Sequence, residues 1–170
     1  MASFSAQGII AVHGTPLDTG DTAQRYPFNT RVFDINGAEW IYLKGITSLV
    51  KGDWVTFDEV GVTARLVANA VGDVGVAGAA IANGDFGWYQ IYGNCTFATS
   101  GDVADAGLLY AHATAGSVDD VAVAGDRIQH AMAHSADDTS DTAVVGSISA
   151  WLGYPYTTNV AGDDTASSAP

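Results

Sequence analysis

The sequence predicts a mainly β fold, and three observations carry this prediction. Gly, Ala, Val, Thr and Asp dominate while Lys, Arg, Gln and Glu are scarce, so long surface helices are not expected. The acidic residues are nearly all Asp, which favours turns, and only Glu39 and Glu59 are Glu, which favours helix interiors. Short segments rich in aromatic and β-branched residues alternate with turn signals. We therefore expect a compact β-sandwich or a β-barrel-like domain.

The chain has 170 residues, of which 48% are hydrophobic, and this suits one domain with short appendages. We expect an extended N-terminal arm over residues 1–30, a β-rich domain over 31–156 and a flexible acidic tail over 157–170. The arm holds the apolar residues Phe4, Ile9 and Ile10 without clear periodicity, with one short strand expected over 8–12. Such an arm is expected to lie on a neighbouring subunit.

The first strands of the domain are expected over 39–44, 54–58 and 62–67, with a turn at 50–53 before the second. Alternation along a strand places Val55 and Phe57 on one face and Trp54 on the other.

Residues 74–82 form an apolar run of small residues, and a strand this small on both sides permits another backbone to approach closely. An Asn-Gly-Asp turn signal follows, and then an aromatic strand over 86–92 that stops at Gly93. This strand carries large side chains on both faces, with Trp88 on one and Tyr89 on the other. It is therefore either central in the sheet or at a subunit contact.

In the last third of the chain the patterns that predict secondary structure are weaker. An acidic turn spans 100–106, a short strand or bend 108–111, and a loop 115–120. Residues 121–125 and 127–134 form an apolar pair, and the last strand spans 143–148 and ends at Trp151. The segment from Trp151 through Tyr154 to Tyr156 is expected to be a fixed turn that docks on the domain's own rim or on another chain.

Composition excludes several classes of partner. There are 19 acidic against 6 basic residues, a net charge of −13, whereas nucleic-acid binding and anionic membrane surfaces need clustered Lys and Arg. No apolar run is long enough to span a membrane, and no secretory signal is expected at the N-terminus. The single cysteine, Cys95, is expected to be a small buried hydrophobe rather than a reactive thiol.

No motif predicts catalysis, a metal or a cofactor. His130 and His134 have the spacing of two zinc ligands on a helix, but the segment favours a strand. They are therefore interpreted as ordinary strand histidines, the alternative being a site shared by three subunits around an axis. The acidic cluster Asp137, Asp138 and Asp141 lacks the spacing of a calcium loop and is interpreted as a solvated turn. A hydrolase would need two carboxylates facing one cleft, and no specific pair is apparent.

The tryptophans leave one alternative open. Trp40, Trp54, Trp88 and Trp151 are most simply core or strand-face residues. A coplanar row of exposed aromatic side chains, however, would suit stacking on sugar rings, and the alternative function is a carbohydrate-binding β-sandwich module. The two interpretations differ in the direction they require for four side chains, those of Trp88, Tyr89, Trp151 and Tyr154.

The order of features over 50–148 resembles the capsid decoration, or cement, proteins that stabilise the heads of tailed phages. The resemblance lies in Gly75-Val-Ala-Gly-Ala-Ala-Ile-Ala82, a short turn, Gly87-Trp-Tyr-Gln-Ile-Tyr-Gly93 and Asn94-Cys-Thr-Phe97. The acidic, Ala-rich segment 100–109 and the late Val123-Ala-Gly-Asp-Arg-Ile128 also fit. The regions 1–30 and beyond Trp151 carry no such match.

This resemblance implies a domain of the β-tulip type that assembles as a homotrimer on the outer surface of an icosahedral head. It implies the major capsid protein as partner, no enzyme activity, and terminal arms that clamp neighbouring subunits. A tail or head-fibre base component is the near alternative. On this view the residues expected to contact partners are Phe4, Ile9, Ile10, Trp88, Tyr89, Trp151, Tyr154 and Tyr156.

Overall fold

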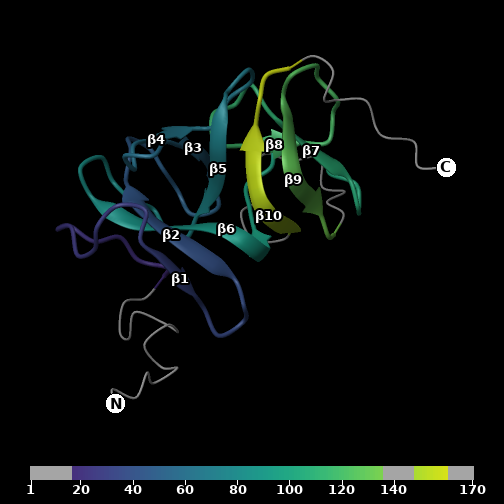
Figure 1. The fold of residues 1–170 in the computed structure, drawn as a ribbon. Helices are drawn as coiled ribbons and strands as arrows, with labels where there is room; N and C mark the ends of the chain where they lie inside the picture. The colour runs from purple at the N-terminus through teal and green to yellow at the C-terminus, as the bar shows by residue number, and fades with distance from the viewer. Residues whose placement is uncertain (1–16, 136–147, 161–170) are drawn as a thin grey trace.

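The computed structural model describes residues 17–135 and 148–160 (Figure 1). Within these ranges the chain forms ten strands and no helix, so the predicted β class is confirmed. The strands are β1 (Arg31–Phe33), β2 (Glu39–Lys44), β3 (Trp54–Phe57), β4 (Thr63–Arg65), β5 (Gly72–Ala77), β6 (Phe86–Thr96), β7 (Leu108–Ala111), β8 (Val118–Asp119), β9 (Arg127–Ala133) and β10 (Ser149–Thr157).

The strands form one bent antiparallel sheet in the order β1-β2-β6-β5-β10-β9-β7-β8, and β3 joins β5 to β4. The long strand β6 is central, which is one of the two positions that its aromatic content on both faces predicted. It pairs with β2 over 86–92, with β5 at Tyr89 and Gln90, and with β10 over 92–96. The sheet folds over itself because β5 and β10 share one edge of β6 and then also pair with each other.

The bent sheet encloses one large core and two smaller clusters. The main core contains Trp54, Val74, Val76, Phe97 and Leu152 among others, and a second core gathers around Ile41, Leu43, Val55, Tyr89 and Ile91. Strand β3 lies between them: Trp54 faces the main core while Val55 and Phe57 face the second, as alternation predicted. The third cluster centres on Val32, Tyr42 and Trp88.

Several strand boundaries differ from the prediction. Strand β5 ends at Ala77, and β6 continues through Gly93, whose φ of 92° is available to glycine, as far as Thr96. Residues 121–125, expected as half of an apolar pair, form a loop that ends in a turn, and Val121 and Val123 are exposed. The short β8 and the edge strand β1 were not predicted, because two or three residues give too little periodicity to recognise.

Residues 17–30 pack on the domain, so the domain begins before the expected boundary at residue 30. Asp21 is buried, exchanges two backbone hydrogen bonds with Phe86, and accepts a hydrogen bond from the Tyr42 hydroxyl at 3.1 Å. The carbonyl of Leu17 lies so close to Gly78 that a Cβ there would be only 2.5 Å from it. The predicted close approach at the small-residue run is therefore made by the chain's own N-terminal segment.

The segment 151–156 is not a docking turn, because it lies within β10. This strand pairs with β6 and β9 before Tyr154 and with β5 and β9 from Tyr156, and it bulges in between. Of the last strand predicted over 143–148, only Ile148 belongs to the described residues.

Candidate binding surfaces

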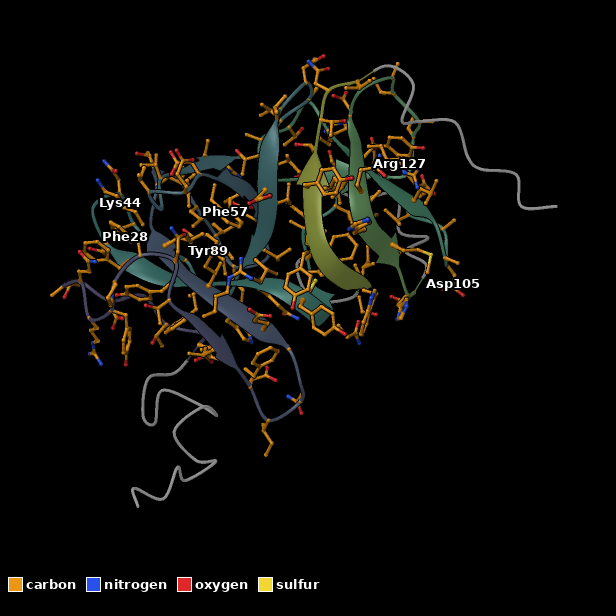
Figure 2. The ribbon with its side chains drawn as sticks, in the orientation of Figure 1. Phe28, Lys44, Phe57, Tyr89, Asp105 and Arg127 are labelled. Atoms are coloured by element: carbon orange, nitrogen blue, oxygen red, sulfur yellow. The ribbon has the colours of Figure 1, made fainter. Side chains whose placement is uncertain are left out.

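The structure places Trp88 and Tyr89 in the interior, which corrects their expected role as partner-contacting residues. Trp88 packs against Tyr42 and Tyr26, with ring centroids 5.0 and 5.5 Å apart. Tyr89, labelled in Figure 2, belongs to the second core and donates a hydrogen bond to the carbonyl of Lys44 at 3.0 Å. Desolvation raises the pKa of the Tyr89 hydroxyl. These side chains supply core packing because the strand that carries them is central.

The other residues expected to contact partners differ in their exposure. Trp151 and Tyr154 are exposed, with 41% and 47% of their surface accessible, and Tyr156 is half-buried. Phe4, Ile9 and Ile10 lie outside the described residues, as do Asp137, Asp138 and Asp141.

An exposed aromatic surface covers the outer side of β6, β10 and β9, and we call it the aromatic face. It consists of Tyr92, Met132, His134, Trp151 and Tyr154. Tyr92 lies between the two aromatic residues of β10, with its ring centroid 5.2 Å from that of each. Trp151 is also the cross-strand partner of Met132, which is itself exposed.

The aromatic face is not a coplanar row. The Tyr92 ring is inclined by 70° to Trp151 and by 31° to Tyr154, and the His134 ring stacks on Trp151 at 6.3 Å. A flat stacking platform for sugars, the arrangement that would favour a carbohydrate-binding module, is therefore not found on this face.

A bulge in β10 sets the direction of Tyr154. The register with β9 shifts between Leu152 and Tyr156, and Tyr154 has a φ of 60°, rare for a bulky residue. His130, on β9, has the same φ and meets the Tyr156 ring edge-on at 5.3 Å. Backbone strain of this kind persists only where the surroundings hold it, and it often accompanies a functional surface.

The surroundings that hold Tyr154 are a buried carboxylate and an arginine. The Tyr154 hydroxyl donates a 2.6 Å hydrogen bond to Glu39, which is only 4% exposed. This hydrogen bond raises the pKa of the Tyr154 hydroxyl. Arg31 pairs with the other Glu39 oxygen at 3.4 Å, and its guanidinium lies 5.9 Å from the centre of the Tyr154 ring.

A groove begins where β5, β6 and β10 diverge. Between their paired stretches the three strands leave a 240 Å³ pocket, which Val74, Ile91, Tyr154 and Pro155 line. This junction pocket shares Arg31, Phe57 and Asp73 with a neighbouring hollow of 860 Å³ that extends toward the end of β10. We call the two together the junction groove; Phe57, labelled in Figure 2, marks where they meet.

A third surface lies at the end of the sheet where β5 begins and β10 ends (Figure 1, top). The loops before β5 and before β9 meet there, since the Asn69 amide donates to the Asp126 carboxylate, and Gly125 lies against Asn159. These segments carry five exposed valines, and we call this surface the valine end: Val67, Val71, Val121, Val123 and Val160.

The remaining candidates for chemistry do not form a site. His130 and His134 contact aromatic rings, and no group of three potential metal ligands occurs among the described residues. Cys95 is buried in the main core, as predicted, and its burial raises the pKa of the thiol to about 12. No helix in the described part of the chain has the length and apolar character to cross a bilayer.

Comparisons of the chain with protein-family models, with curated proteins and with solved structures give no match. The functional argument therefore stands on the sequence resemblance and on the surfaces described above.

Proposed function

We propose that this protein is a capsid decoration protein, a virion structural component that binds the outside of an icosahedral phage head as a homotrimer. The major capsid protein is its proposed partner, and neither nucleic acid nor a membrane is. The observation that carries the proposal is the presence of two separate exposed apolar surfaces, the aromatic face and the valine end, on one small domain.

A cement protein needs two kinds of interface, one with its own copies and one with the shell. The aromatic face suits the first. Trp, Tyr and Met are enriched in interface cores, and truncating such anchors gives the largest losses of binding energy. Met132 and Trp151 lie side by side on adjacent strands, so a second copy would cover both together.

The valine end suits attachment to the shell. Its exposed side chains lie on loops, which adapt to a partner more readily than a sheet face does. Each interface of standard size buries about 1,600 Å². Binding to the assembled shell stabilises it by mass action, and the gain is repeated at every site on the head.

The acidic charge agrees with a position outside the shell. A net charge of −13 would repel packaged DNA at an inner wall, whereas an outer-surface protein does not meet the genome. The function itself needs no catalytic group, only buried area at the joints.

The experiment that tests the proposal separates the two interfaces by variants. Trp151→Ala combined with Met132→Ser is expected to dissociate the trimer, as measured by light scattering. Val71→Ser combined with Val123→Ser is expected to leave the trimer intact but to abolish co-sedimentation with undecorated phage heads. Ile35→Ser is the matched control, because Ile35 is 94% exposed in a turn outside both surfaces.

One result would contradict this function, and another would contradict the role given to the aromatic face. One is a protein that remains monomeric at every concentration and does not sediment with heads. The other is a wild-type trimer that the aromatic-face variant leaves unchanged while the control behaves like the wild type; this would remove the aromatic face from the account.

A further inference from the structure

We propose that the junction groove is a binding site for a neutral oligosaccharide. This inference goes beyond the structural role proposed above, because that role needs no small ligand; the groove shares Tyr154 with the aromatic face and Val71 with the valine end. It rests on the shape of the groove, on its preorganised walls and on its mixture of hydrogen-bonding groups.

The shape follows from the sheet topology. Strand β10 leaves β6 after Gly153 and meets β5 at Tyr156, while β5 leaves β6 before Val76. The opening between the three strands cannot be closed by backbone pairing, so a depression persists there. The adjoining hollow, at 860 Å³, falls within the range of small-molecule sites and is large enough for several sugar rings.

The walls are held in place by buried contacts. Glu39 fixes both Arg31 and Tyr154, and the bulge in β10 turns Tyr154 toward them. Tyr156, further along the strand, lines the larger hollow. The groove thus has one tyrosine in each of its two parts, and Arg31 and Phe57 lie between them. An aromatic ring can pack against the C–H face of a sugar ring. A site whose residues are already ordered loses less entropy when a ligand binds.

The polar groups of the walls are unevenly satisfied. Thr157 is only 2% exposed, and its hydroxyl has no hydrogen-bond partner among the described residues. The side-chain Nδ2 of Asn29 donates a hydrogen bond to the carbonyl of Glu59 at 2.7 Å. Its Oδ1 is buried and has no hydrogen-bond partner among the described residues. Unsatisfied buried polar groups are rare in proteins, and two of those found among the described residues belong to side chains that line this groove.

The hydrogen-bonding groups of the lining suit a neutral, hydroxyl-rich ligand. The lining carries three carboxylates, Asp58, Glu59 and Asp73, and one guanidinium, Arg31, which pairs with Glu39. Carboxylates accept hydrogen bonds from hydroxyl groups. An anion would meet the carboxylates. A lysine-rich peptide would be attracted by the same carboxylates, and it is the competing occupant to be tested.

The test is isothermal titration calorimetry of the full chain with neutral tetra- to hexasaccharides of glucose, galactose, mannose and N-acetylglucosamine. A lysine-rich peptide serves as the competing probe. We expect at least one oligosaccharide to bind. Asp73→Asn and Tyr156→Ala are each expected to weaken it about tenfold or more, because one removes a charged acceptor and the other an aromatic ring from the lining.

Asp105→Asn is the matched control, because Asp105 is an exposed carboxylate far from Phe57 and the groove (Figure 2). It is expected to bind as the wild type does. Three results would overturn the inference: no binding of any oligosaccharide, binding that neither groove variant weakens, or binding of the peptide alone. The oligomeric mass of each variant is recorded in parallel, so that failure of this inference is distinguishable from failure of the proposed function.

Discussion

At the scale of single residues, Glu39 links the fold to the aromatic face and to the junction groove. It is one of only two glutamates, it is buried at the edge of the third cluster, and it holds Arg31 and Tyr154 at once. The sequence gives no signal of this role, because the residues that meet at Glu39 are 8 and 115 positions away along the chain. Only the sheet topology brings them together.

Tyr154→Phe tests how far the hydrogen bond from the Tyr154 hydroxyl to Glu39 supports the groove. The variant keeps the ring but leaves the Glu39 oxygen without its donor, at a cost of about 1–3 kcal/mol in the free energy of unfolding. Chemical denaturation measures this loss. Tyr92→Phe is the matched control, and an equal loss in both variants would argue against a special role for the Tyr154–Glu39 contact.

The Cys95 thiol is expected to be unreactive in the folded protein. Burial raises its pKa to about 12, so at pH 8 the native thiol keeps its proton, whereas an unfolded thiol, with a pKa of about 8.5, is partly ionised. Stability should therefore fall as the pH rises from about 8.5 toward 12. Labelling with an aromatic disulfide reagent should require denaturant, and rapid labelling of the native chain at pH 8 would contradict the burial.

Gly116→Ala is expected to lower the free energy of unfolding by about 2–5 kcal/mol. Gly116 has a φ of +82°, and a Cβ there would lie 2.8 Å from the Asp53 carboxyl carbon, which pairs with Arg65 at 3.0 Å. Gly84→Ala is the control: its φ is +94° but no atom lies within 4 Å, so only the backbone cost of about 1–2 kcal/mol applies. Equal losses in thermal unfolding would show that the crowding has no effect.

At the scale of elements, alternation and turn chemistry predicted most of the strands. The strands at 39–44 and 54–58 were predicted to within a residue because their β-forming side chains are bounded by clear turns. The segment 121–125 was expected to be half of an apolar pair, but its valines are exposed, because composition does not distinguish an exposed valine from a buried one. The bulge at Tyr154 was not predicted, since the Gly-Tyr-Pro sequence is equally typical of a turn.

The N-terminal segment is the element whose interpretation changed most. Deleting residues 1–30 is expected to lower the midpoint of thermal unfolding, since the deletion removes Asp21 and Tyr26, which contact Tyr42 in the third cluster. Tyr26→Ala isolates the described part of this effect and should lower the midpoint in the same direction. A deletion variant as stable as the full chain would show instead that the segment is a detachable arm, as the sequence suggested.

At the scale of the whole molecule, the fold class followed from composition, but the binding surfaces did not. The choice between Trp88 and Trp151 as surface residues depends on which strand is covered on both faces, and pairing partners far along the chain decide this. The junction groove depends on three strands that diverge, which no local pattern encodes. Trp151 and Tyr154 were singled out from their aromatic character alone, and the structure places both on one exposed face.

The account's central claim is that this domain works as a trimer on a phage head. The most direct test is the mass of the purified full chain by light scattering, alone and after sedimentation with undecorated heads. We expect three times the 17.5 kDa chain mass in solution, and a trimer that sediments with the heads at saturating occupancy. A chain that stays at 17.5 kDa and remains in the supernatant would contradict the claim.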